Sequence, residues 1–113
     1  MYNNSAVARV LIGGGADPNA LDEQEHETPL LRAAMNGGVD VAKVLIANGA
    51  AVNMKSGSDG DTPLHAASMD NRTEMVELLI RMGADISARN YRDKTPAQET
   101  GDRHIKELLG AKK

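Results

Sequence analysis

The pattern of apolar and polar residues alternates along the chain between helical spacing and irregular polar stretches. Val41, Val44 and Leu45 fall on one face of a helix. A glycine, Gly49, follows them, and the same pattern returns further along the chain in MVELLIRMG. Each of these segments therefore predicts a short amphipathic helix that ends at a glycine.

A second kind of short helix begins at a Thr-Pro pair. The pairs at 28–29 and 62–63 place a good N-cap residue before a proline, which loses nothing at the first helical position because its missing N–H has no partner there. The helices that follow end at Gly37 and Asn71, two residue types that tolerate the left-handed backbone of a helix C-terminus. Each Thr-Pro helix thus precedes one of the amphipathic helices.

These features repeat with one period. Thr-Pro occurs at 28, 62 and 95, and Gly-Ala occurs at 15, 49 and 83, so that the spacings are 34 and 33 for the first marker and 34 and 34 for the second. Polar segments rich in Asp, Asn, Gly and Ser connect the units and predict extended, turn-forming fingers. Helices this short are marginal alone, because isolated helices below about 12–15 residues barely form in water. The repeat therefore predicts a solenoid in which each unit buries its apolar face against the next.

The repeat resembles the ankyrin family. TPLHAASMDNRTEMVELLIRMGADISA (62–88) follows the family pattern almost throughout, and TPLLRAAMNGGVDVAKVLIANGAAVNM (28–54) departs from it at Leu31, where the family has His. The resemblance covers essentially the whole chain. It implies an all-α repeat solenoid, a stack of antiparallel helix pairs with β-hairpin-like finger loops.

The register divides a single domain into four units. A partial N-terminal repeat and its finger occupy 1–27, two repeats occupy 28–61 and 62–94, and a shortened capping repeat occupies 95–113. The first two fingers are one residue longer than the third, which predicts a longer tip or a bulge in the first two. The last unit lacks three residues between its helices and carries many charged residues, as a wettable end of an array requires.

The N-terminal end begins part-way through a unit. Met1, Met35 and Met69 are each separated by one repeat period, so Met1 corresponds to the end of a first helix that is absent. We expect that the chain is the C-terminal part of a longer array, or that a second chain covers this end. Upstream repeats should then raise the melting temperature.

The composition excludes several classes of function. The net charge of −3 gives no basic footprint for nucleic acid, and no apolar run reaches the roughly 18 residues that span a bilayer. The chain has no Cys, so we expect no disulfide and an intracellular protein, cytoplasmic or nuclear. It also has no Phe or Trp, so small aliphatic side chains must form the core.

Two polar clusters raise the question of chemistry. SDGDTPLHAAS contains Asp59, Asp61, His65 and Ser68, the ingredients of a hydrolase or metal site. We interpret it as a finger turn and a helix start, with His65 completing the cap, because a triad also needs an oxyanion site and a pocket. His26 lies among glutamates, but neighbouring finger residues splay into water and do not converge on a metal. We predict no catalytic residue, no metal and no cofactor.

The resemblance implies a concave face, lined by fingers and first helices, that binds a partner protein. The finger-tip residues in register are Gln24, Glu25, Glu27, Ser58, Asp59, Asp61, Tyr91, Arg92 and Lys94. The exposed ends of the first helices are Met35, Asn36, Met69 and Asp70.

Charge differs between the fingers. The first tip carries Asp22 and three glutamates, whereas Arg89, Arg92 and Lys94 outweigh the aspartate of the third. Screening over about 8 Å leaves these as two local patches, which predicts that the acidic tip contacts a basic patch of the partner and the basic tip an acidic one.

We expect the protein to be an adaptor, scaffold or inhibitor that binds a partner protein. The alternative is a C-terminal regulatory or targeting module of a larger enzyme or channel, and a free-standing enzyme is disfavoured because no residue set converges.

Overall fold

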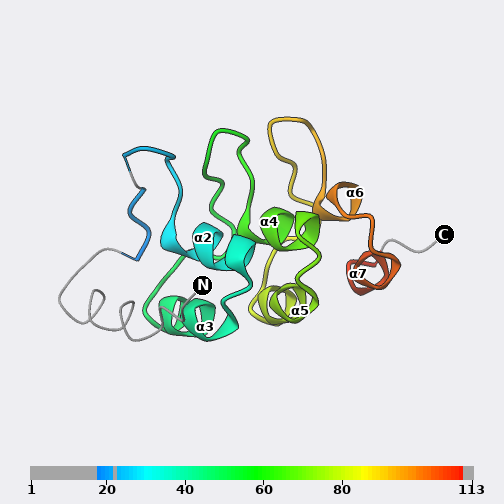
Figure 1. Cartoon of the computed structure of the whole chain (residues 1–113), viewed down its shortest axis with the longest axis horizontal. Coiled ribbons are helices and arrows are strands. Elements are labelled where there is room, and N and C mark those ends of the chain that lie inside the picture. The colour runs from blue at the N-terminus through cyan, green and yellow to red at the C-terminus, as the bar shows by residue number, and fades with distance from the viewer. Residues whose placement is uncertain (1–17, 22, 111–113) are drawn as a thin grey trace.

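The computed structural model describes residues 18–21 and 23–110. Within these residues the chain forms two layers of short helices (Figure 1). The first layer holds α2 (Pro29–Asn36), α4 (Pro63–Met69) and α6 (Pro96–Glu99). The second holds α3 (Val39–Ala47), α5 (Thr73–Arg81) and α7 (Arg103–Leu108). The prediction of an all-α repeat stack is confirmed. The predictions for 1–17, including the register of Met1, and for Asp22 lie outside the described residues.

The first-layer helices begin as the Thr-Pro pairs predict. Thr28 Oγ1 accepts the Leu31 N–H at 3.1 Å, and Thr62 Oγ1 accepts the His65 N–H at 3.3 Å. The helix ends also agree with prediction, because Gly37 (φ 69°) and Asn71 (φ 55°) both adopt the left-handed backbone. Local sequence therefore sets both ends of these helices.

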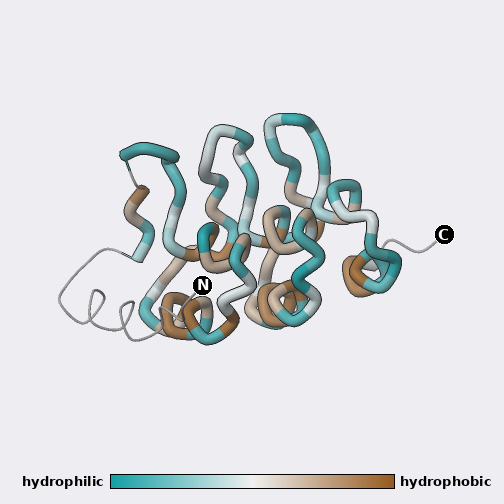
Figure 2. The backbone as a smooth tube through the Cα atoms, in the orientation of Figure 1, coloured by the Kyte–Doolittle hydropathy of each residue, from teal (hydrophilic) through white to brown (hydrophobic). Residues whose placement is uncertain are grey.

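The core lies between the two layers. Leu30, Leu45, Leu64, Leu79 and Ile105 are almost completely buried there, and apolar residues concentrate on the facing sides of the helices (Figure 2). Helix α4 contacts α2 on one side and α6 on the other, so every unit packs against its neighbours. Burying a Leu side chain stabilises the fold by about 1.5–3 kcal/mol. A short helix by itself cannot gain this energy because it has no neighbour to pack against.

Three finger loops project from the same side of the stack (Figure 1). Finger 1 comprises the described part of 18–27, finger 2 spans 50–61, and finger 3 spans 84–94. The Ser56 N–H donates to the Asp61 carbonyl at 2.9 Å and closes a four-residue tip, whereas the Asn90 N–H donates to the Lys94 carbonyl at 3.0 Å and closes a three-residue tip. The extra residue of finger 2 is therefore a longer tip, as predicted.

Candidate interaction surface

Each finger turns back toward its helix at an equivalent left-handed residue. His26, Gly60 and Asp93 stand two positions before the capping threonine and have φ values of 56°, 66° and 61°. A positive φ is uncommon outside glycine, although His and Asp adopt it more readily than most residues. The tips are thereby aimed alike although their sequences differ.

An asparagine near the start of two fingers joins each finger to the next unit. Asn19 Oδ1 accepts the Ala51 N–H at 2.6 Å, and its amide donates to the Gly49 carbonyl at 3.1 Å. Asn53 repeats this arrangement one unit later, with the Asp85 N–H at 2.7 Å and a carbonyl at 3.3 Å. These side chains act as clamps that fix the spacing of the finger bases. Sequence reasoning missed them, although their separation by one repeat period was available as a signal.

The fingers also contact one another at their tips. The Gly57 N–H of finger 2 donates to the His26 carbonyl of finger 1 at 2.6 Å, and the Tyr91 N–H of finger 3 donates to the Asp59 carbonyl at 2.9 Å. Backbone hydrogen bonds therefore connect all three tips in one row.

A buried asparagine organises the contact between fingers 2 and 3. The amide nitrogen of Asn90 donates to Asp61 at 2.8 Å and to Glu99 of α6 at 2.6 Å. Its side-chain oxygen accepts the N–H groups of Arg92 and Lys94 at 2.9 and 3.1 Å. All the hydrogen-bonding capacity of this side chain is used within the fold, which suits a residue that is 5% exposed.

Arg92 bridges the same two fingers and α6. Its guanidinium lies 3.3 Å from Asp59 and 2.6 Å from Glu99. Burial of the Glu99 carboxyl raises its pKa, but the hydrogen bonds from Arg92 and Asn90 outweigh burial and leave the pKa below its ordinary value. The hydrogen bond with Glu99 raises the pKa of Arg92. Both groups are therefore charged at neutral pH.

His65 belongs to the architecture, as the cap interpretation predicts. Its Nδ1 accepts the Thr62 N–H at 3.2 Å and lies 2.8 Å from Thr62 Oγ1. Its Nε2 lies 2.7 Å from the Lys94 carbonyl of the next finger, and since a carbonyl only accepts, Nε2 carries the proton. Ser68 is also fully buried. With both ring nitrogens engaged and the side chain buried, His65 is not placed to accept a proton from a substrate.

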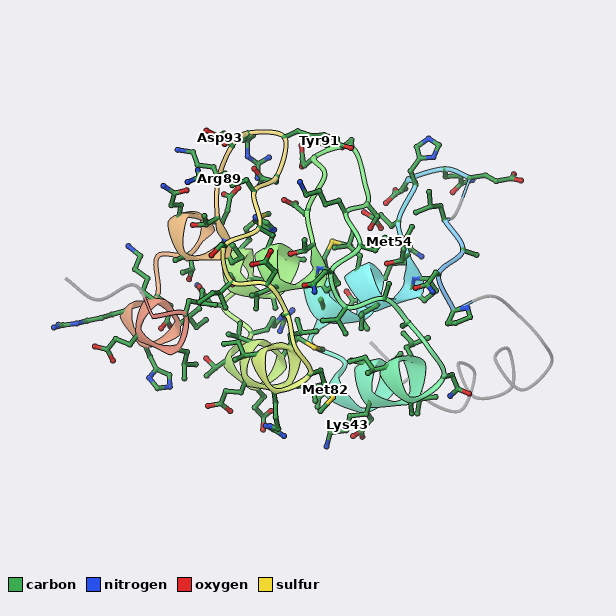
Figure 3. All side chains as sticks on the ribbon, turned by 180° about the vertical axis from the view of Figure 1, so that it is seen from behind. Lys43, Met54, Met82, Arg89, Tyr91 and Asp93 are labelled. Carbon is green, nitrogen blue, oxygen red and sulfur yellow. The ribbon has the colours of Figure 1, made fainter. Side chains whose placement is uncertain are left out.

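Tyr91 is the most exposed large apolar side chain in the described part of the chain, at 74%. Its ring lies against the backbone of Gly60, where an added Cβ would come within 2.5 Å of a ring carbon. Tyr91 stands at the outer end of fingers 2 and 3 (Figure 3). The ring is therefore held against finger 2 while most of the side chain stays exposed to solvent.

Most of the predicted surface residues are exposed. They are Gln24, Glu25, Asn36, Ser58, Asp59, Met69, Asp70, Tyr91, Arg92 and Lys94. Met35 and Glu27 are half-buried, and the Glu27 carboxylate lies 3.3 Å from Arg32. The placement of Asp61 at an exposed tip is wrong: it is 7% exposed, because Asn90 draws its carboxylate into the contact between fingers.

The prediction of a basic third tip also needs correction. Arg92 is neutralised by Asp59 and Glu99, and Arg89 lies 3.5 Å from Asp93. A count of charges within finger 3 is correct for that finger alone. It omits the carboxylates that the neighbouring finger and helix supply. Lys94 is the third cation of this tip and is exposed.

No group of three His, Asp or Glu side chains within 18–21 and 23–110 is arranged to hold a metal ion. In the same residues, no helix has the length and apolar character needed to cross a membrane.

The repeat matches a family model described as ankyrin repeats (3 copies) over residues 1–90. The chain belongs to the ankyrin repeat family. Ankyrin repeat domains are generally protein–protein interaction modules and typically have no enzymatic activity, so the finger surface is the natural candidate site.

A solved ankyrin structure is closely similar. The ankyrin repeat domain of Bcl-3, described as a unique member of the IkappaB protein family, superimposes with a TM-score of 0.84 and is 31% identical in sequence. The match covers 90% of this chain and 44% of that one, so the present chain spans less than half of that domain. No match was found among curated proteins.

Proposed function

We propose that this ankyrin chain is a recognition module that occupies the surface of a partner protein and thereby acts as an adaptor, scaffold or inhibitor. The observation that carries the proposal is the row of cross-linked tips. Because hydrogen bonds connect finger 1 to finger 2 and finger 2 to finger 3, side chains from three units share one fixed surface. A partner then binds without the entropy cost of ordering three loops.

Affinity capture with matched variants tests this function. Gln24→Arg with Ser58→Arg adds two charged side chains to exposed tips, whereas Ala47→Arg with His104→Arg adds the same charge to exposed sites of α3 and α7. We expect a partner captured by the unmodified chain to be lost with the first variant and kept with the second. Equal loss with both, or loss with the second alone, contradicts binding through the fingers.

A further inference from the structure

The outer end of fingers 2 and 3 presents an aromatic ring in a fixed position. Two contacts hold Tyr91: the hydrogen bond of its N–H to the Asp59 carbonyl at 2.9 Å and the packing of its ring on Gly60. An exposed aromatic side chain that is already ordered loses little entropy on binding, which is why Tyr is enriched among the residues that dominate interface energies. Tyr91 is therefore the best-prepared anchor on this surface.

The charge along the row of fingers favours one sign of partner. Arg92 forms ion pairs with Asp59 and Glu99, and Arg89 is paired with Asp93. In finger 1, Glu23 and Glu25 are exposed, the described residues of this finger contain no Lys or Arg, and the nearby Arg32 of α2 is paired with Glu27. Lys55 and Lys94 are the remaining cations of fingers 2 and 3, and Lys55 precedes the tip turn. By the formal charge of the described residues, finger 3 carries +1, finger 2 carries −1 and finger 1 carries −3, so the row of fingers becomes more negative from Tyr91 toward finger 1.

The size of the surface fits an extended segment. Packed helices lie about 8–10 Å apart, so neighbouring fingers are separated by about the same distance. An extended chain rises about 3.3 Å per residue, so about three residues connect one finger to the next. A cation over the face of a tyrosine ring is attracted by the ring, and Arg provides such a cation on a planar, weakly hydrated group.

Building on the proposed function, we infer that the partner presents a basic, extended segment to this surface. One Arg or Lys stacks on the exposed ring of Tyr91, and a second cation about six residues away lies near Glu23 and Glu25. An acidic segment is repelled by finger 1, and the charge complementarity acts mainly on the association rate and on specificity.

Selection of short random peptides against the full chain tests this inference. We expect the selected peptides to be enriched in Arg and Lys. Tyr91→Ala should weaken a selected peptide by about fivefold, whereas Tyr91→Phe, which keeps the ring, should bind it normally. Selection of acidic or uncharged peptides, or equal binding by Tyr91→Ala, would overturn the inference.

A charge-reversal pair separates local recognition from net charge. Glu23→Lys with Glu25→Lys should weaken the selected peptide and flatten its salt dependence, whereas Glu74→Lys with Glu77→Lys, on exposed sites of α5, should do neither. Equal effects of both pairs would show that the attraction depends on net charge alone, and this would overturn the inference.

If the chain binds no peptide and captures no partner, the proposed function fails as well. A partner that binds elsewhere on the fingers leaves the proposed function in place and overturns only this inference.

Discussion

At the scale of single residues, one side chain can serve two units. His65 caps its own helix through Nδ1 and reaches the next finger through Nε2. In the preceding unit Leu31 takes the equivalent position and is buried as an apolar residue, at 3% exposure. The same position in the repeat can thus hold a hydrogen-bonded histidine or a buried apolar residue, depending on the polar groups that surround it.

Replacing His65 by Leu should destabilise the fold. The Thr62 N–H and the Lys94 carbonyl lose their partner, and an unpaired buried polar group costs about 1–3 kcal/mol. We expect urea unfolding to report a loss of about 2 kcal/mol or more. A loss below about 0.5 kcal/mol would mean that water or a shifted backbone satisfies both groups.

Ser68→Ala should have the opposite effect. Ser68 is completely buried, its hydroxyl has no hydrogen-bond partner, and the equivalent residue one unit earlier is the buried Ala34. Removing an unsatisfied hydroxyl from the core should raise the free energy of unfolding by up to about 1 kcal/mol. A decrease in thermal unfolding temperature would reveal a hydrogen bond that the hydroxyl makes.

At the scale of elements, hydrogen bonds between units decide how the fingers stand. The clamps of Asn19 and Asn53 hold the finger bases, and Asn90 with Arg92 connects fingers 2 and 3 to α6. The clamps, and the bond from Asn90 to Asp61, join residues about thirty positions apart in sequence. The fingers therefore behave as one surface rather than three loops.

Asn53→Ala should loosen the base of finger 3. The Asp85 N–H and the Gly83 carbonyl each lose a partner at an exposed site, so the stability should fall by only about 1 kcal/mol. Amide hydrogen exchange gives the sharper readout, because the Asp85 amide should exchange faster. Ser87 has the equivalent position in the third unit, where no such clamp is present among the described residues, and Ser87→Ala is the matched control. Unchanged exchange at Asp85 would argue against the clamp.

The contact between finger 3 and α6 should be sensitive to acid. Because the pKa of Glu99 in the folded chain lies below its ordinary value of 4.5, its carboxylate stabilises the fold above that pH. This contribution is lost as the pH falls through the folded pKa. Glu99→Gln, which cannot titrate, should therefore lose less stability than the unmodified chain between neutral and acidic pH. Urea midpoints across this range measure the effect, and parallel pH profiles would contradict it.

At the scale of the whole molecule, the stack is nearly one-dimensional, since each helix contacts mainly the helices of its own and adjacent units. A central unit is thus supported on two sides, and α7 on one. In such arrays stability is approximately the sum of the units and their interfaces. The position of a core substitution along the stack should matter as much as its chemistry.

Leu64→Ala and Leu109→Ala test this dependence on position. Both side chains are buried, but Leu64 lies in central α4 and Leu109 follows α7. Leu64→Ala should cost about 2–5 kcal/mol and weaken all units together. Leu109→Ala should cost less and increase hydrogen exchange mainly in α7. Equal, global effects of both substitutions would show that the stack unfolds as one unit.

The sequence by itself determined the elements and their order. The Thr-Pro caps, the left-handed Gly37 and Asn71 and the repeat period act through residues close together in the chain, so local chemistry fixes where each helix begins and ends. The sequence also identified the row of fingers and most of its exposed side chains.

Only the tertiary structure decided which finger residues face solvent and which charges stay unpaired. Asp61 and Arg92 look alike in sequence, as charged residues at finger tips, yet Asn90 buries the first and two carboxylates neutralise the second. The open ring of Tyr91 likewise depends on the absence of a side chain at Gly60, in another finger. These outcomes depend on partners supplied by the neighbouring unit, and the distance between such partners is fixed only when the units stack.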